Sequence, residues 1–525
     1  MEKPIIRLYH QEELDIEDEE SLGDGDNCTK YELRMYGMDD KGKEYVLFVD
    51  GIRPSFWIKV PIGWANTDTR NFILFLREKV GKKYEKDVIG GKNPKYWETH
   101  LFSKLYGFDN YKKHKFIKIN FKNIKAMKRA KSLWYHKYPN HGKLVDGGFR
   151  FKGSLMKIYE CNLPTMLLYF HEQKLLTSGW ITFNEDVKPV KKKYKITNCD
   201  YEYKIQYDNI KPLELEKIAP LKKCSWDIEA KSSHGDFPIP KKSYKKLATE
   251  LVDKILKNPD ENRIKLIRRC IFAAFGYGDE EDISIVYLKP DDYGNINYSE
   301  YNLENSLEKF LNQVVNCEIT KKNRNIMINK FEKIMGMPIE NGFSGCFPRI
   351  AGDEVTMIGS TFVKVGELDP YWNHMAVVGD CDDIPEVPNR KIDVYDTEKE
   401  LLIGWAKMIG ETKPNIMLGY YIFGFDWKFL IARVEELNCK DEFMENLSRY
   451  KYETTKVIHK TIKVASGTHD DIYVKMEGCL QMDLAAHFRK TVNLDSYKLA
   501  LDSDPISAFG GIVSCNFKIT RKLAL

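Results

Sequence analysis

The sequence predicts a protein of mixed α/β and α+β class with more than one domain. Its 525 residues exceed what one hydrophobic core normally supports, and the 43% hydrophobic content is sufficient for folded domains. Strand-like patterns around Gly-containing turns dominate up to about residue 200, and strands and helices alternate from about Pro212 onward. We therefore expect a mixed β N-terminal domain followed by an α/β domain.

Within the N-terminal part, Val46–Pro61 predicts two strands around a Gly-containing turn. Ile117–Lys137 is rich in Lys and Arg, and its apolar residues recur at helical spacing, which predicts an amphipathic helix with a basic outer face. That face with its interleaved aromatic rings could follow a single nucleic-acid strand, or it could be a solvated helix face with its aromatics in the core. Lys188–Lys195 is typical of an exposed strand or linker.

In the second part, a strand over Leu221–Ile228 is followed by a long helical stretch and then by alternating elements. Helical patterns occupy Tyr244–Leu256 and Leu303–Lys333, within a stretch from Pro240 to Pro348. The further elements expected are strands at Val355–Val365, Lys391–Tyr395 and Asn415–Ile422, a helix opened by the capping box Thr397–Glu400, and a helix at Trp427–Leu437.

Composition excludes several classes of protein. No run of about 18 apolar residues exists, and the N-terminus lacks the apolar core of a signal peptide, so we expect no membrane segment. The 11 cysteines are scattered singly, which is typical of reduced thiols and not of zinc sites or disulfides. These features favour an intracellular protein of the nucleus or cytoplasm. A net charge of +5 does not by itself announce a polyanionic partner.

Three carboxylates are the candidate site. Asp227 and Glu229 lie two apart on an apolar strand and therefore project from the same side, and Asp426 ends a second apolar run. Gathered carboxylates repel each other unless a cation lies between them, and two hard divalent ions held this way are typical of phosphodiester hydrolysis. The alternative is that Asp227 and Glu229 are plain surface acids. Asp426 also opens the following helix, so a helix N-cap is a second role, compatible with the first.

The tripeptide alone is weak evidence, because Asp15-Ile16-Glu17 repeats it. That copy lies in an acid-rich run and has no apolar strand before it, so we expect a solvated, mobile segment there.

Around these carboxylates the residues resemble the amino-terminal half of a family B DNA polymerase, of the delta-like kind found in eukaryotes and giant DNA viruses. Ser225–Glu229 with the following Gly235–Pro238 is similar to the family's first exonuclease motif, and Gly419–Asp426 is similar to the second. Tyr159–Pro164 resembles the segment that closes the family's N-terminal domain, and Gln481–Leu484 with Leu494–Leu499 resembles the stretch leading toward the third motif.

The resemblance implies a ribonuclease H-like 3′–5′ exonuclease domain. In such a domain Asp227, Glu229 and Asp426 would hold two magnesium or manganese ions, and Phe425 and Tyr421 would lie near the frayed 3′ end of the primer strand. The implied partners are DNA and, in a full-length protein, a sliding clamp, at a nuclear or cytoplasmic viral replication site. Asp483 is expected to be structural.

The same resemblance divides the chain into segments. We expect an acidic mobile segment over 1–29, a polymerase N-terminal domain over 30–211, an exonuclease domain over 212–499 with a helical insertion at about 240–348, and a foreign-looking tail over 500–525. That tail resembles a piece of the bifunctional enzyme that formylates AICAR and cyclises the product to IMP, or it is a chance likeness in a Gly-containing turn. It is too short for a formyltransferase core.

Two departures from the family pattern bear on activity. Tyr421 stands where the second motif has Asn, and no candidate for the third motif, Tyr-x-x-x-Asp, follows Asp426. The polymerase palm signatures are also missing. We therefore expect a fragment of a replicative polymerase with weak or undetectable exonuclease activity, because a metal site short of one ligand binds its ions poorly. The alternatives are a stand-alone 3′–5′ exonuclease and a catalytically dead DNA-binding module.

Overall fold

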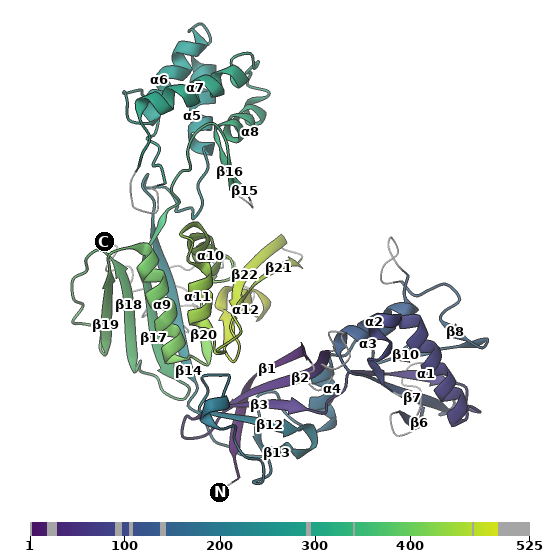
Figure 1. Cartoon of the computed structure of the whole chain (residues 1–525). Helices are drawn as coiled ribbons and strands as arrows, with labels where there is room; N and C mark the ends of the chain where they lie inside the picture. The colour runs from purple at the N-terminus through teal and green to yellow at the C-terminus, as the bar shows by residue number, and fades with distance from the viewer. Residues whose placement is uncertain are drawn as a thin grey trace.

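The fold contains three large β-sheets and a separate helical unit, as the computed structural model shows (Figure 1). The predicted mixed α/β class is confirmed. The structure describes residues 3–17, 29–89, 97–103, 109–136, 143–289, 296–339, 342–464 and 467–491. The expected tail over 500–525 and the stretch Leu494–Leu499 lie outside the described residues.

The first sheet has the strand order β12-β3-β2-β1-β11-β13. Its strands are β1 (Ile5–Glu17), β2 (Thr29–Met38), β3 (Glu44–Asp50), β11 (Trp180–Thr182), β12 (Tyr201–Gln206) and β13 (Lys211–Leu213). Helix α4 (Thr165–Glu172) contributes Tyr169 and Phe170 to the apolar cluster on this sheet. The segment Lys188–Lys195, predicted as an exposed strand or linker, contains only a short 3-10 helix at Lys192–Tyr194.

The mobile segment expected over residues 1–29 is wrong for Ile5–Glu17. These residues form β1, which pairs antiparallel with both β2 and β11. Ile6 and Leu8 are fully buried, so apolar burial and strand pairing outweigh the local acid content. Asp15 has a definite task here: its two carboxylate oxygens accept the amides of Ile124 and Lys125 at 2.8 and 3.1 Å.

The second sheet lies beside the first in the N-terminal part. It contains β4 (Ser55–Val60), β5 (Val88–Ile89), β6 (Glu98–Ser103), β7 (Lys113–Phe121) and β10 (Lys157–Tyr159). Its apolar core is shared with α1 (Asn66–Val80) and α3 (Ile124–Lys131). Short pieces complete the unit: α2 (Lys82–Glu85), β8 (Arg150–Phe151) and β9 (Ser154–Leu155). The two strands predicted in Val46–Pro61 exist, but β3 and β4 belong to different sheets.

The helix predicted over Ile117–Lys137 covers only part of that range. Ile117, Ile119 and Phe121 are buried alternately in β7, and α3 starts after Asn123, whose side chain accepts the amide of Ala126 at 2.7 Å. Buried residues that alternate with less buried ones at the start of the range are typical of a strand and not of a helix. Phe121 and Trp134 are both buried, so the interpretation that places these aromatics in the core is confirmed.

The third sheet has the order β19-β18-β17-β14-β20-β23. Its strands are β14 (Lys222–Lys231), β17 (Glu354–Lys364), β18 (Trp372–Val378), β19 (Arg390–Tyr395), β20 (Ile416–Gly419) and β23 (Leu480–Asp483). The strands β14, β20 and β23 run parallel, whereas β17 is antiparallel to β14 and β18. Other elements of this part are α9 (Glu398–Thr412), α10 (Asp426–Glu436), α11 (Lys440–Leu447), the hairpin β21 (Lys456–Val464) and β22 (Gly467–Lys475), and α12 (Leu484–Thr491).

Local signals set the bounds of several elements in this sheet. The predicted capping box is present, because the Thr397 side chain and Glu400 each accept the other's backbone amide. The strand predicted over Asn415–Ile422 is shorter, since pairing ends at Gly419.

A helical unit interrupts the third sheet between β14 and β17. It consists of α5 (Lys245–Lys257), α6 (Arg263–Ala274), α7 (Glu300–Val314) and α8 (Arg324–Met335), with the short pair β15 (Met337–Ile339) and β16 (Gly342–Ser344). The helical prediction for this stretch is confirmed. The four helices share their own apolar core and lie beyond one end of the sheet (Figure 1).

Buried polar contacts join the first sheet to the third. The Glu44 carboxylate accepts hydrogen bonds from Arg449 and Asn415, both at 3.0 Å. Arg34 binds both oxygens of Glu453, at 3.0 and 3.1 Å. Of the five side chains in these contacts, all except Glu453 are buried, so these bonds hold the two parts of the chain against each other.

Candidate functional site

The site begins where β14 loses one of its two neighbours. Pairing between β14 and β20 ends at Ser225 and Leu418, but β14 continues beside β17 as far as Lys231. Asp227 and Glu229 lie on this continuation of β14. The edge of β14 that pairs with β20 up to Ser225 is therefore open beside these two acids. Both acids are half-buried. The strand and its acids were predicted, but the early end of β20 was not.

A compact loop then carries the chain from β20 to the third acid. The Asp483 carboxylate accepts the amides of Tyr421 and Phe423 at 3.1 and 3.0 Å, and it also accepts the amide of Ala486 at 3.2 Å. Asp483 thus holds the loop and the start of α12 together, as expected of a structural residue. The loop ends at Phe425, and α10 begins at Asp426.

Asp426 is nearly fully buried and faces β14. Its Oδ1 accepts the backbone amide of Ile228 at 3.3 Å, which lies on the open edge of the strand. The prediction that Asp426 serves as the helix N-cap is wrong: the N-cap residue is Phe425, and Asp426 is the first residue of the helix. The carboxylate therefore bridges the helix to the strand between Asp227 and Glu229.

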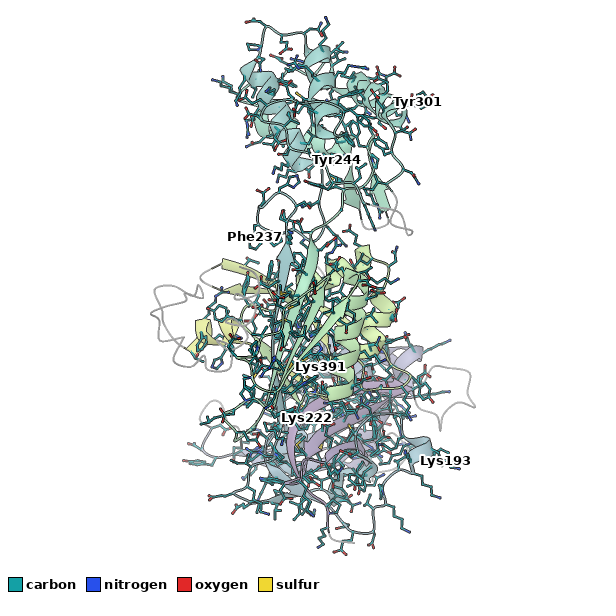
Figure 2. The ribbon with its side chains drawn as sticks, turned by 90° about the vertical axis from the view of Figure 1, so that its left-hand side faces the viewer. Lys193, Lys222, Phe237, Tyr244, Tyr301 and Lys391 are labelled. Atoms are coloured by element: carbon teal, nitrogen blue, oxygen red, sulfur yellow. The ribbon has the colours of Figure 1, made fainter. Side chains whose placement is uncertain are left out.

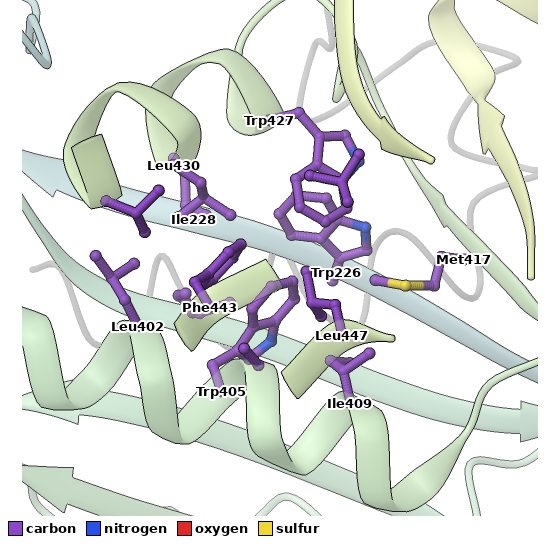
Figure 3. Packing of buried hydrophobic residues seen from close by; sticks show 14 of the residues in the cluster. Trp226, Ile228, Leu402, Trp405, Ile409, Met417, Trp427, Leu430, Phe443 and Leu447 are labelled. Carbon is purple, nitrogen blue, oxygen red and sulfur yellow. The ribbon is translucent and has the colours of Figure 1, made fainter. Parts of the chain in front are cut away.

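Three tryptophans pack in the apolar core next to β14 and α10. Trp226, Trp405 and Trp427 have ring centroids 4.8 to 6.1 Å apart, and they lie at the centre of the core (Figure 3). Trp226 precedes Asp227 and Trp427 follows Asp426, so the packing of each ring fixes the neighbouring carboxylate. The Trp427 indole also donates to Gln481 at 2.8 Å.

The electrostatics of the three acids favour a cation. Burial raises the pKa of Asp227, and a hydrogen bond with Asp426 lowers it in part. Burial and the charge of Asp227 together raise the pKa of Asp426 well above the usual range. Burial and the same charge raise the pKa of Glu229. In the metal-free site Asp426 therefore holds its proton more tightly than an ordinary aspartic acid does, and its carboxyl group is hydrogen-bonded to that of Asp227.

This donor set fits a hard divalent cation, because the Asp227–Asp426 pair offers carboxylate oxygens, which such ions prefer as ligands. The charge of Asp227 acts on the pKa of Glu229, but the three carboxyl groups do not lie close enough together to form one coordination shell. Among the described residues, no three His, Cys, Asp or Glu side chains lie closely enough to hold an ion together.

The two predicted aromatic residues lie on either side of the loop. Phe425 packs against Phe429 and against Phe237, with centroids 5.6 and 5.5 Å away. Tyr421 is exposed, and the Arg489 guanidinium lies 5.4 Å from its ring. Phe237 was not predicted as a site residue, although Gly235–Pro238 was recognised as part of a motif.

Tyr421 has a left-handed backbone with φ of +63°. Asn and Gly adopt this conformation more readily than Tyr, which gives a physical reason for Asn at the corresponding place in the family motif. Gly424 permits the conformation observed, because a Cβ there would lie 2.4 Å from the Tyr421 ring.

Comparisons with known proteins agree with this geometry. A family model described as DNA polymerase family B, exonuclease domain, matches residues 156–274 and 290–501. The chain is 29% identical to a DNA polymerase of Phaeocystis pouchetii virus, over 90% of the chain and 51% of that protein. It is 26% identical to a DNA polymerase of Pyramimonas orientalis virus, over 94% and 41%.

A cellular relative is more distant. The DNA polymerase delta catalytic subunit of Schizosaccharomyces pombe is 19% identical over 89% of the chain and 32% of the subunit. The chain thus spans about half, or less, of the length of these curated relatives. No helix in the described part is long and apolar enough to cross a membrane. Because the family match covers more than half of the chain, the chain belongs to DNA polymerase family B and carries the exonuclease domain of that family.

Proposed function

We propose that this chain is the part of a replicative DNA polymerase that removes nucleotides from the 3′ end of a DNA strand. The observation that carries the proposal is the pair formed by the half-buried Asp227 and the buried Asp426 at the open edge of β14, with Glu229 on the same strand. Exonuclease domains of family B polymerases generally use divalent metal ions, and the relatives are DNA polymerases, so DNA is the partner.

In this proposal Asp227, Asp426 and Glu229 are the catalytic acids and the ligands of two magnesium or manganese ions. Bound ions would supply Lewis acidity to an attacking water and to the leaving 3′ oxygen. Because the pKa of Asp426 is raised, binding of a cation by this carboxyl group would be coupled to release of its proton. Phe425 and Tyr421 would contact the unpaired terminal bases, since aromatic rings stack on bases without sequence preference.

The domain division, the helical insertion and a clamp partner belong to the same proposal. A place of action in the nucleus or at a cytoplasmic viral replication site is proposed with them. The likeness of residues 500–525 to a purine-synthesis enzyme stays a prediction without a function attached to it.

The test is a 3′ exonuclease assay on the purified chain. Single-stranded DNA labelled at its 5′ end is incubated with Mg²⁺ or Mn²⁺, alongside Asp227→Ala and the exposed-acid control Asp369→Ala. We expect slow shortening by the chain and by the control, and none by Asp227→Ala. Equal rates for the chain and Asp227→Ala would contradict the proposal. No shortening under any condition, with DNA still bound, would favour the dead DNA-binding module.

A further inference from the structure

A cavity of about 550 Å³ opens between the segment that follows Asp227 and Glu229 and the helical unit. Its walls come from residues 232–243, from the start of α5 and from residues 284–287. This volume lies within the range of roughly 300–1,000 Å³ typical of ligand sites. Figure 2 shows Phe237 where the sheet meets the helical unit, and Tyr244 at the base of that unit.

Large apolar side chains are exposed around this cavity. Phe237 is 74% exposed, Ile239 51%, Ile285 53% and Tyr287 44%. Such a concentration on a soluble surface marks an interaction site. Tyr287 is held in place, because its ring packs edge-on against His234 at 5.2 Å and its carbonyl accepts the amide of Ala351 at 2.9 Å.

Four lysines lie at the rim, of which Lys241 and Lys242 already pair with Glu435 and Asp353. The cavity is lined by Lys241, Lys242, Lys245 and Lys246, against the acids Asp236 and Glu250. Glu250 is already engaged, because its two oxygens accept the hydroxyl and the amide of Ser284 at 2.6 and 2.9 Å.

Two of these lysines can contact a ligand with little loss of stabilising interactions within the protein. Lys245 is exposed at the start of α5. Lys246 pairs with Asp236 at 2.9 Å, but both side chains are exposed, at 43% and 60%, and exposed pairs contribute little stability. Either lysine can therefore bind a phosphate.

Two aromatic rings in contact connect the wall of the cavity to the candidate active site. Phe237 lines the cavity, and its ring lies 5.5 Å from that of Phe425, which directly precedes Asp426. We propose that the cavity holds a stretch of the single DNA strand whose 3′ end reaches the carboxylates. Tyr287 and the apolar side chains would take bases, and Lys245 and Lys246 would take phosphates. This inference rests on the proposed function and extends it to the helical unit.

Equilibrium binding tests the proposal separately from cleavage. The full chain carrying Asp227→Ala is titrated in EDTA with a fluorescein-labelled oligothymidylate, and fluorescence anisotropy is followed at several salt concentrations. We expect the added pair Lys245→Ala and Lys246→Ala to weaken binding and to reduce the slope of log K against log salt by about 1.4, because each single-strand phosphate contact contributes about 0.7. Tyr287→Ala should weaken binding about tenfold and Tyr287→Phe should retain it.

The control is Lys265→Ala, an exposed lysine in the first turn of α6 that does not line the cavity. It should leave both the affinity and the salt slope unchanged. Binding by the lysine pair variant and by Tyr287→Ala that equals the parent overturns the proposal, and so does a parent that binds no single strand. Weakened binding in these variants together with an inactive nuclease would contradict the proposed hydrolysis and leave the DNA-binding cavity standing.

Discussion

Asp227 and Asp426 meet beside the open edge of β14, where their carboxyl groups are hydrogen-bonded to each other. Burial raises the pKa of both, and the charge of Asp227 raises that of Asp426 further. The protonated form is therefore favoured in the folded, metal-free chain more than in the unfolded chain. The consequence is a cost in folding free energy that is absent at low pH and grows as the pH rises above the usual aspartate pKa.

Asp426→Asn removes this cost while keeping the shape of the side chain. Its amide oxygen can still accept from Ile228, and its NH₂ can donate to Asp227 in place of the carboxyl proton. In EDTA at pH 8 we expect a higher melting temperature than for the parent, and no gain near pH 4. Calorimetry over this pH range is the measurement.

The same variant tests metal binding. Adding Mg²⁺ should raise the melting temperature of the parent, because an ion that binds only the folded chain stabilises it, and Asp426→Asn should gain less. Asp369→Asn, at an exposed site, is the control and should follow the parent in both solutions. If Asp426→Asn melts below the parent in EDTA at pH 8, ionised Asp426 does not lower the stability of the folded chain, and the interpretation of its raised pKa is contradicted.

At the scale of elements, the structure gives the two Asp-Ile-Glu sequences different surroundings. One belongs to the candidate site, and the other stabilises the fold. Asp227 and Glu229 lie on a strand whose neighbour ends early, so their edge is open. Asp15 lies where β1 pairs only with β2, but its carboxylate is engaged within the fold, because it accepts the first two amides of α3. The first amides of a helix have no partner within the helix, so a carboxylate from another strand can satisfy them.

Asp15→Ala should destabilise the N-terminal part by about 1 kcal/mol, because two amides of α3 lose their acceptor. Urea unfolding gives the free energy, and hydrogen exchange should show faster opening at Ile124 and Lys125. Glu17→Ala is the matched control, two residues along the same strand and exposed. Equal stability of the two variants would show that the cap is not important in solution.

At the scale of the whole molecule, a buried acid of the first sheet contacts the hairpin of β21 and β22. Glu12 on β1 pairs with Lys475 of β22 at 2.7 Å, and Glu477 lies close enough for the charge of Glu12 to act on it. Burial, and then the charge of Glu12, raise the pKa of Glu477 from the ordinary glutamate value to about 7. Glu477 is also buried, with Oε2 unpartnered, so this interface carries a pH-dependent cost.

Glu477→Gln should therefore raise stability at pH 8 and leave it unchanged near pH 4. Between these limits the unfolded chain ionises Glu477 before the folded chain does, so the parent loses stability as the pH rises through about 7, by up to about 3 kcal/mol. Thermal unfolding across this range measures the effect. The exposed Glu445→Gln is the control, and a pH-independent difference would show that Glu477 acts through packing alone.

The sequence by itself determined the class and the family, and it predicted Asp227, Glu229 and Asp426 as the candidate site. Alternating apolar residues around Trp226 specify the strand, and the motif at Gly419–Asp426 specifies the turn into the helix. The capping box at Thr397 was likewise readable, because it depends on side chains only three residues apart. Local chemistry of this kind needs no knowledge of distant segments.

Only the tertiary structure decided the rest. Acid content predicted mobility at Ile5–Glu17, but pairing with β2 and β11 overrides it. Helical spacing over Ile117–Lys137 missed β7, because sheet pairing comes from remote strands. The raised pKa values of Asp227 and Asp426, the amides that Asp483 accepts and the cavity beside Phe237 all depend on residues far apart in the chain. The physical reason is that pKa shifts, sheet edges and cavities arise from burial and contact between segments, which a local pattern does not contain.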